Sequence, residues 1–398
     1  MHQPLTGIRV LDLTHYVAGP YCTKLLADYG AEVIKIEKPD KGDISRSVGP
    51  FYQDKPNSET SGLFLFLNTS KKSLTLNLKS DPGIVLFKEL VAQVDLVVES
   101  FRPSVMPGLG LGYETLREIN TGLVMSSISN FGRKGPYQDY KMDEIVADAM
   151  GGWMHTTGEP DREPLKPGGY QAQFTAGVYG ALATMTAITH QELTGLGQWV
   201  DVSILECVVN MLMADTSLYS YTGEIKKREG TRHKAYPSTV LPCKDGHIGV
   251  IGHTPHQWEA FCAWMDKQEL LDDPRFENSP TRREHADELD AILVPWLAER
   301  TQEELYHGAQ ELRIPFGKVM DTEQIMQHSQ LDARHYFVDI DHPATGKITY
   351  PGAPFRFGDL PYGVKRAPLL GEHNEEIVCS WLGYSRQDLE RFRQRGVV

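Results

Sequence analysis

A turn near the start of the chain has the residue types and the position expected of a ligand-binding loop. Residues 14–20 read Thr-His-Tyr-Val-Ala-Gly-Pro and lie between a branched apolar run at 8–13 and a helical pattern at 20–29. In a parallel sheet, the loop after the first strand faces the ligand crevice. The N–H groups at the start of the following helix are suited to a phosphate. His15 could take part in such a site, or it could be an ordinary histidine at a strand end.

The same turn argues against a dinucleotide such as NAD. Glu37 follows the second predicted strand, where a dinucleotide-binding fold keeps the acid that binds its ribose. The turn, however, has no G-x-G-x-x-G pattern, and without those glycines the backbone cannot approach a pyrophosphate in the usual way. We therefore expect no NAD.

Basic side chains gather near the predicted crevice, although the chain is acidic overall. Lys and Arg number 40 against 53 Asp and Glu, a net charge of −13, which disfavours nucleic acid as the main partner. The local excess of cations favours a pocket for a phosphorylated ligand, although each one alone could be a solvated surface residue. These positions are Lys35, Lys38, Lys71, Lys72, Lys79, Arg102, Arg133, Lys134 and Lys141.

Other patterns that carry chemistry are missing from the sequence. There is no G-x-S-x-G, H-E-x-x-H or C-x-x-C string, so we expect neither a serine triad nor a metal site. The five cysteines are widely spaced, which fits reduced thiols. The chain has no secretory signal pattern and no run of 18 apolar residues, so we expect a cytoplasmic protein.

The elements that must position these residues alternate between strand and helix patterns. Repeated strand–helix–strand units predict an α/β fold with a mostly parallel, doubly wound, Rossmann-like sheet. The predicted strands are residues 8–13, 32–36, 73–78, 95–99 and 123–128, and the predicted helices are 20–29, 81–94, 113–119, 174–193 and 203–213. A turn at Asp245-Gly246 and helical patterns over 255–330 then indicate a smaller mixed region.

Several strings resemble the class III CoA-transferases, the family of formyl-CoA transferase and of carnitine and bile-acid CoA-transferases. The resemblance covers nearly the whole chain, in order. The strings include GIRVLDLTHYVAGPYCTKLLADYGAEVIKIEKPDKGD at 7–43, VVESFRPSVMPGLGLGYETL at 97–116, TGLGQWVDVSILE at 194–206 and RAPLLGEHNEEI at 366–377. Racemases of 2-methylacyl-CoA share this fold and many of the strings, so transfer and racemisation both stay open at this point.

The resemblance implies a large Rossmann-like domain from residues 1–200 and 331–398, and a small α+β domain with linkers from 201–330. It implies two homologous chains threaded as an interlocked homo- or heterodimer. The substrates would be an acyl-CoA and a carboxylic acid, with no metal and no NAD. Lys38 departs from the arginine of some members but keeps the charge. The residues that the resemblance places in the coenzyme A site are His15, Tyr16, Val17, Ala18, Lys38, Leu76, Lys79, Phe101 and Lys141.

The chain departs from the family at the catalytic position. In the transferases, an aspartate before the long small-residue helix attacks the thioester and forms a covalent intermediate. Counting back from TGLGQ places that aspartate at Gln173, whose amide is a poor nucleophile, and no acidic residue lies between Glu163 and Glu192. The racemase pair is also incomplete, since the histidine position of that family is Met142 here.

Three explanations remain, of which we favour the first. The chain is one subunit of a heteromeric CoA-transferase, and a partner chain supplies the aspartate. Alternatively, Asp143 or Glu144, close in sequence to Lys141, stands in as the nucleophile, although a helix-capping or surface role is the simpler account for both. In the third explanation, the chain binds acyl-CoA without transfer, as a scaffolding subunit, or catalyses another acyl-CoA reaction.

Overall fold

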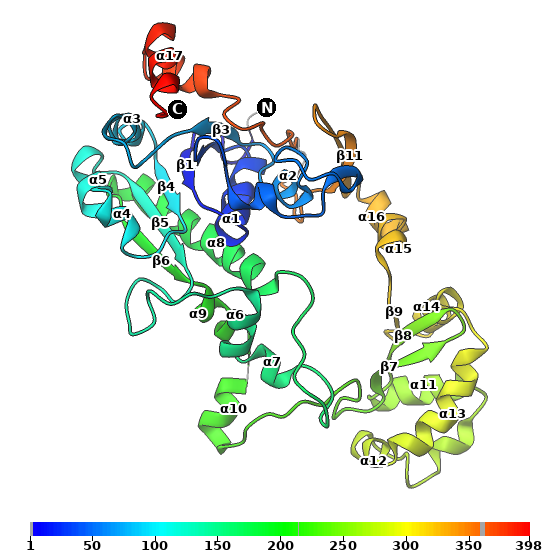
Figure 1. The fold of residues 1–398 in the computed structure, drawn as a ribbon. Coiled ribbons are helices and arrows are strands. Elements are labelled where there is room, and N and C mark those ends of the chain that lie inside the picture. Colours follow the sequence, from blue (N-terminus) through cyan, green and yellow to red (C-terminus); the bar gives the residue numbers. More distant parts are fainter. Residues whose placement is uncertain (1–2, 214, 359–362) are drawn as a thin grey trace. The chain divides into compact units, whose positions relative to one another are not determined.

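A computed structural model describes residues 3–213, 215–358 and 363–398, and the internal contacts divide the chain into two units (Figure 1). The first unit is formed by Met1–Trp153, Pro167–Met213 and Asp332–Val398, and the second by Met154–Lys166 and Ala214–Leu331. Compared with the expected division, residues 201–213 lie in the first unit and residues 154–166 in the second. Residues 201–213 belong there because helix α9 (Ile204–Asn210) packs on α8 (Gln171–Thr194).

The first unit is built around a parallel sheet, which confirms the predicted doubly wound α/β architecture. Within the described residues the sheet has six strands in the order β3-β2-β1-β4-β5-β6, all paired in parallel. The order reverses between β1 and β4, and open α/β sheets commonly bind ligands beyond the carboxyl ends of the strands at such a reversal. The strands are β1 (Arg9–Leu13), β2 (Glu32–Glu37), β3 (Lys72–Thr75), β4 (Leu96–Glu99), β5 (Val124–Ser129) and β6 (Trp199–Ser203).

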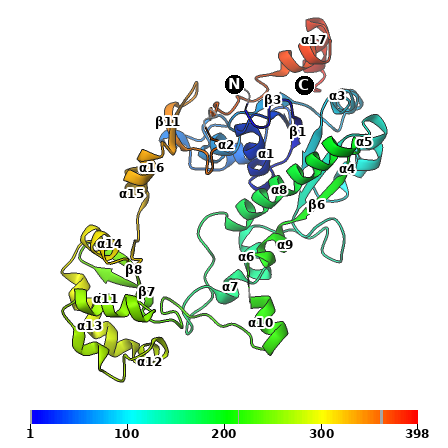
Figure 2. The same cartoon turned by 180° about the vertical axis from the view of Figure 1, so that it is seen from behind.

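Helices cover both faces of this sheet, because successive buried residues of a strand point to opposite sides. Val10 packs in one apolar cluster with α1 (Ala18–Asp28) and α8, whereas Leu11 packs in another with α3 (Asp81–Val91) and α5 (Tyr113–Ile119). Both views show α8 alongside α1 (Figures 1 and 2). This approach requires glycine at 177, where an added Cβ would lie 2.8 Å from the Ala18 carbonyl oxygen.

The remaining elements of the first unit are short. After the C-terminal hairpin the chain returns to the edge of the sheet beside β3, where His373 N donates to the Ser73 carbonyl. The elements are η1 (Ile44–Ser47), η2 (Tyr52–Asp54), α2 (Gly62–Leu67), α4 (Val105–Gly108), α6 (Glu144–Met150), β10 (Phe337–His342), β11 (Gly346–Pro351), the π-helical η4 (Glu376–Trp381) and α17 (Arg386–Gln394).

The second unit has its own core, in which Phe261 packs against Trp258, Trp264 and Phe316. It joins an antiparallel sheet to helices, as expected for the smaller α+β region. Its elements are β7 (Ser238–Cys243), β8 (Gly246–Ile251), β9 (Gly317–Lys318), α10 (Asp215–Thr222), α11 (Pro255–Trp264), η3 (Gln268–Leu271), α12 (Ser279–Glu284), α13 (Ala286–Ala298), α14 (Gln302–Glu311) and α15 (Thr322–Met326). Two further short helices, α7 (Trp153–Thr156) and α16 (Ser329–Ala333), lie where the chain passes between the units.

None of the helices in the described parts of the chain is long and apolar enough to cross a membrane.

Candidate functional site

The turn from Thr14 to Ala18 leaves β1 at the carboxyl edge of the sheet and leads into α1. Tyr16 has a φ of 72°, a left-handed conformation that a bulky residue rarely adopts. Side chains from other segments hold the backbone of the turn in this conformation. Thr14 O accepts from Lys35 Nζ at 2.9 Å, His15 N donates to Ser100 Oγ at 2.9 Å, Tyr16 N donates to Asp43 Oδ1 at 3.2 Å, and Ala18 N donates to Gln173 Oε1 at 3.3 Å.

Beneath the turn lies a network of four buried charges, which we call the buried charge network: Asp12, Lys35, Asp43 and Lys71. Lys35 Nζ lies 2.7 Å from Asp43 Oδ2, and Lys71 Nζ lies 3.0 Å from Asp12 Oδ2. All four side chains are fully buried in these pairs. Removing one member would leave an uncompensated buried charge, so the network fixes β1, β2 and the turn relative to one another.

The charges of this network shift one another's pKa values. Burial acts to raise the pKa of Asp12, but Lys35 and Lys71 outweigh it and hold that pKa well below its usual range. The same balance of burial against Lys35 lowers the pKa of Asp43. Burial lowers the pKa of Lys71 to about 8. The sequence-based interpretation of Lys35 and Lys71 as cations for a phosphate is therefore wrong, because both are buried and paired within the protein.

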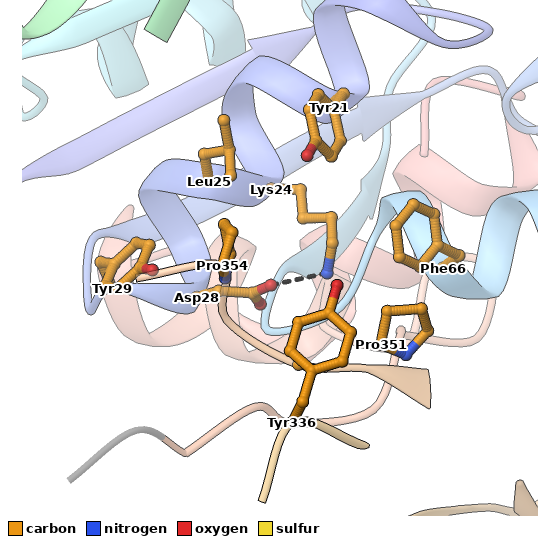
Figure 3. Close-up of a pocket in the computed structure, with 10 residues that line it drawn as sticks. Tyr21, Lys24, Leu25, Asp28, Tyr29, Phe66, Tyr336, Pro351 and Pro354 are labelled. Carbon is orange, nitrogen blue, oxygen red and sulfur yellow. Dashed lines mark hydrogen bonds and ion pairs between the residues drawn. The ribbon is translucent and has the colours of Figure 1, made fainter. Parts of the chain in front are cut away.

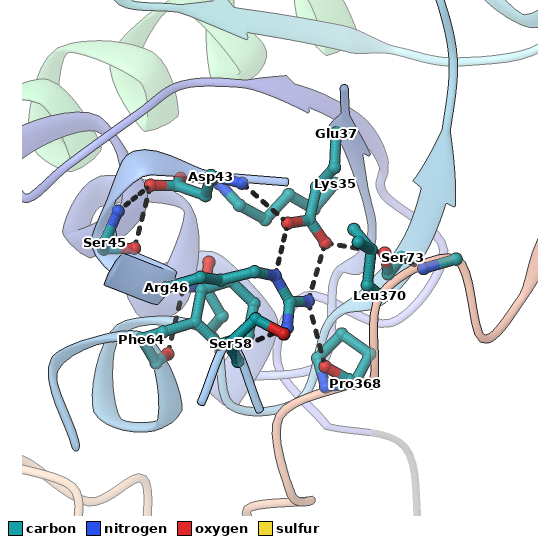
Figure 4. A network of polar contacts seen from close by, with 12 residues as sticks. Lys35, Glu37, Asp43, Ser45, Arg46, Ser58, Phe64, Ser73, Pro368 and Leu370 are labelled. Atoms are coloured by element: carbon teal, nitrogen blue, oxygen red, sulfur yellow. Dashed lines mark hydrogen bonds and ion pairs between the residues drawn. The ribbon is translucent and has the colours of Figure 1, made fainter. Parts of the chain in front are cut away.

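A second buried pair closes the other side of the β2 loop. Arg46 donates to both carboxylate oxygens of Glu37, at 2.7 and 2.9 Å, and its guanidinium lies 3.6 Å from the centre of the Phe64 ring (Figure 4). Ser73 Oγ donates to Glu37 Oε1 at 2.6 Å. Glu37 therefore binds the protein's own side chains, and the position that could hold a ribose is occupied.

His15 lies where the turn meets the loop after β4. Its ring centroid is 5.5 Å from that of Phe101, and its Nδ1 lies 3.8 Å from Asp43 Oδ2. Burial lowers the pKa of His15; the Asp43 carboxylate acts in the opposite direction, and Lys35 and Lys38 add to the lowering. The histidine is thus held mainly neutral near pH 7, as a half-buried polar group beside an aromatic ring.

At the other end of the turn, Gln173 and Glu144 meet at the start of α8. Glu144 is buried, and its Oε1 accepts from Ala172 N at 2.7 Å while its Oε2 accepts from Gln173 N at 3.3 Å. A carboxylate at the first turn of a helix is favoured by the helix dipole. Asp143 caps α6 through the backbone N–H of Glu144, at 2.7 Å. Both carboxylates therefore have the helix-capping roles that the sequence suggested for them.

Two tyrosines lie next to this corner. The rings of Tyr16 and Tyr170 meet edge to face with centroids 5.6 Å apart. Burial, together with the neighbouring Tyr170 side chain, raises the pKa of Tyr16 well above its usual value. Neutral phenols at this point add hydrogen-bonding groups without adding charge.

The other predicted residues lie along the same edge of the sheet with different exposure. Lys38, Lys79 and Lys141 are exposed, whereas Leu76 is buried in the apolar cluster behind β3. Lys38 acts electrostatically on His15, which places its charge close to the turn. Arg133, another predicted cation, is instead paired with Glu99 at 2.7 Å. Arg102 and Lys134 are exposed as well, so the exposed cations of the predicted set are these lysines and Arg102.

A separate small pocket in the first unit does not offer such charge. It has a volume of about 50 Å³ and lies between α1, α2 and the two ends of the β10–β11 hairpin, at Tyr336 and at 351–354. Its lysine, Lys24, donates to Asp28 Oδ2 at 2.6 Å (Figure 3). It also donates to Thr69 Oγ1 at 2.6 Å. Because Lys24 is already neutralised by Asp28, the pocket has no free cation for a phosphate. Within the described ranges, no three His, Cys, Asp or Glu residues are placed to hold a metal ion.

Sequence reasoning missed the residues that organise the turn. Asp12 lies inside an apolar strand and Asp43 in the loop after β2, and Ser100 follows β4 directly. Asp12 could have been predicted as a structural residue, because it is a single carboxylate within an apolar strand. A carboxylate buried in this way requires a cationic partner.

The parallel sheet with a reversal between β1 and β4, and a polar turn at that edge, define an α/β fold of the kind that places its ligand site at the carboxyl ends of the strands. The family model of CoA-transferase family III matches residues 5–374. The chain belongs to this family, whose members are enzymes that move coenzyme A between an acyl-CoA and a carboxylic acid.

Named relatives and solved structures agree with this assignment. The chain is 35% identical over 402 residues to succinyl-CoA–D-citramalate CoA-transferase of Chloroflexus aurantiacus, covering 100% of this chain and 98% of the relative. It is 33% identical over 422 residues to formyl-CoA:oxalate CoA-transferase of Bradyrhizobium diazoefficiens, covering 100% and 98%. A CAIB/BAIF family protein from Brucella suis matches with a TM-score of 0.87 at 30% identity, covering 96% of this chain and 100% of that one.

Proposed function

We propose that this chain is the coenzyme A-binding subunit of a heteromeric CoA-transferase whose homologous partner carries the nucleophilic aspartate. The observation that carries the proposal is Gln173 at the start of α8, where the family resemblance expects the aspartate. An uncharged amide cannot form the mixed anhydride with the acyl group. Glu144, the nearest candidate to replace it, has both oxygens engaged by backbone N–H groups.

In this proposal the turn binds the coenzyme. His15 and Tyr16 line it with their side chains, the buried Val17 and Ala18 contribute backbone groups, and Phe101 adds an aromatic surface beside His15. Exposed lysines at the same edge would neutralise the phosphates. These lysines are Lys38, Lys79 and Lys141.

An apolar stripe on α8 supports pairing with a second, homologous chain. Val178, Leu182 and Leu193 are 50%, 63% and 81% exposed on this helix, at spacings that place them on one side. A stripe of this kind on a long helix is typical of an interface. The chain also passes between its units at residues 153–154, 166–167, 213–214 and 331–332, so that two chains could thread through one another as interlocked rings.

The relatives suggest which substrates to test first. Their names include succinyl-CoA:mesaconate CoA-transferase from Haloarcula marismortui and succinyl-CoA:glutarate CoA-transferase from Mus musculus. We therefore propose small dicarboxylic acids and their CoA thioesters as the substrate class.

We also propose that the protein works in the cytoplasm. Its five cysteines form no disulfide bonds, which fits a reducing compartment.

The test compares the chain alone with the chain co-expressed beside a homologue that has aspartate at this position. The chain alone should bind coenzyme A but give no CoA exchange from succinyl-CoA to a dicarboxylate, and co-expression should restore exchange. In the chain alone, Gln173→Asp should create a hydroxylamine-sensitive acyl adduct visible by mass spectrometry.

Three outcomes would change the proposal. Exchange by the homogeneous wild-type chain, lost in Glu144→Gln but kept in Asp143→Asn, would assign the nucleophile to Glu144. Exchange of the hydrogen at carbon 2 of a 2-methylacyl-CoA would indicate racemisation instead. A co-expressed pair that binds acyl-CoA without exchange would assign this chain a non-catalytic scaffolding role.

A further inference from the structure

The side chain of Gln173 is held in one orientation. Its Oε1 accepts from Ala18 N at 3.3 Å, and its own backbone N–H donates to Glu144 Oε2 at 3.3 Å. An amide flipped about its last bond would point N–H donors at the N–H of Ala18, which cannot accept. The orientation with Oε1 toward α1 is therefore the one that the local hydrogen bonds require.

This orientation leaves the amide nitrogen available. Among the described residues, no hydrogen bond uses Gln173 Nε2, and this atom is not one of the buried side-chain atoms that lack a partner. It therefore keeps access to solvent, although the residue as a whole is only 6% exposed. Gln173 presents two N–H donors from a side chain that is otherwise fixed, which is the arrangement of a preorganised hydrogen-bond donor.

The chemistry of this position is thus the reverse of that of a carboxylate. A carboxylate offers an electron pair, whereas the Nε2 group of Gln173 offers hydrogen atoms to an oxygen. Coenzyme A itself has no oxygen at its thiol end, but an acyl-CoA has the carbonyl oxygen of the thioester there.

We propose that Gln173 Nε2 donates a hydrogen bond to the thioester carbonyl oxygen of a bound acyl-CoA, so that this chain prefers acyl-CoA to a CoA species without that carbonyl. The inference rests on the proposed coenzyme A site.

The test measures how much the carbonyl oxygen adds to affinity. Two unreactive probes are compared by calorimetry: the ketone analogue of acetyl-CoA in which CH2 replaces sulfur, and S-ethyl-CoA, which lacks the carbonyl. The wild-type chain should bind the ketone about two- to tenfold more tightly, as expected of one neutral hydrogen bond.

The decisive variant is Gln173→Glu at pH 8, so that the introduced carboxyl is ionised. It still offers an acceptor to Ala18 N but has no hydrogen to donate. We expect its preference for the ketone to disappear while its affinity for S-ethyl-CoA stays within about twofold, since no donor to the probe is lost there. Gln173→Met, which also lacks the donors without adding charge, should lose the preference as well.

The matched control is Gln171→Glu, on the exposed side of the same helix turn. It should keep the wild-type preference. An unchanged preference in both Gln173→Glu and Gln173→Met would overturn the inference, as would a wild-type chain that binds the two probes equally. A wild-type chain that binds neither probe would instead overturn the proposed coenzyme A site.

Discussion

The two ends of the turn between β1 and α1 are anchored in opposite ways. Its first residues are held by the buried charge network, through Lys35 to Thr14 O and Asp43 to Tyr16 N. Its last residue is held by the neutral amide of Gln173. The first end has the rigidity that ligand binding needs, and the second lacks the charge that covalent transfer needs. Under the proposed function, this contrast separates the part of the fold that binds coenzyme A from the part that would carry the chemistry.

The largest effect should follow from removing a charge at the first end. In Lys35→Met, Asp43 and part of Asp12 lose a buried partner, so the free energy of unfolding should fall by about 3–5 kcal/mol. Urea unfolding followed by circular dichroism measures this change. The exposed Lys41→Met serves as control and should change stability by less than about 0.5 kcal/mol. Equal stabilities of the two variants would mean that the network does not hold the fold.

A smaller loss of stability should follow from Asp43→Asn. This variant keeps an oxygen that can accept from Tyr16 N but removes the negative charge that faces Lys35. We expect stability to fall by about 2 kcal/mol, the cost of a hydrogen bond to a charged group. Because the turn loosens, the affinity for coenzyme A should fall by about tenfold, equivalent to about 1.4 kcal/mol. Calorimetric titration with coenzyme A measures it, and the exposed Asp40→Asn is the matched control.

The pH dependence of the first end should be visible at His15. Burial lowers its pKa in the folded chain below the ordinary 6.5. The unfolded chain therefore binds more protons as the pH falls through 6.5, and the stability due to the neutral histidine, complete above that pH, is lost below it. His15→Gln should remove the histidine's contribution to the pH dependence of the free energy of unfolding between pH 7 and 5.5.

The same histidine also reports on its neighbour. Since the Asp43 carboxylate acts to raise the pKa of His15, Asp43→Asn should lower that pKa further, as measured by NMR titration of the imidazole. A rise in the pKa would contradict the assigned contact.

The smallest effect is expected at the exposed lysines. Lys38→Ala, Lys79→Ala and Lys141→Ala should each weaken coenzyme A binding by a few-fold at low ionic strength, and by less at 0.5 M salt, because exposed charges are screened (the Debye length is about 10 Å at 0.1 M). Lys41→Ala is the control. A salt-independent loss would mean that the lysine acts through structure and not through charge.

Much of the first unit could be predicted from the sequence, because its strands are apolar runs separated by helical periodicity. The strand β6 was missed, since Trp199 and Asp201 of this edge strand are exposed and break the apolar run. The turn at 14–18 was predicted as a binding loop. The pairing of Asp12 with Lys71 was not, because it joins residues 59 apart in the chain and depends on the order of the strands.

At the second end, the family resemblance singled out Gln173 but could not predict the orientation of its amide. Its orientation depends on Ala18 N, which approaches only after α1 and α8 have packed together. Local patterns cannot predict such a contact, because it is created by the tertiary structure. The same holds for Glu144, whose helix-capping contact is with α8 and not with its own helix.

The repeated passage of the chain between its two units has a practical consequence for assembly. In the proposed interlocked pair, the two threaded rings cannot come apart while both remain folded, so finished subunits of such a pair cannot exchange. A mixed pair must form while at least one chain is still being synthesised or refolded. Stirring together two purified homodimers would then give no hybrid, whereas making both polypeptides in one cell, in matched amounts, would.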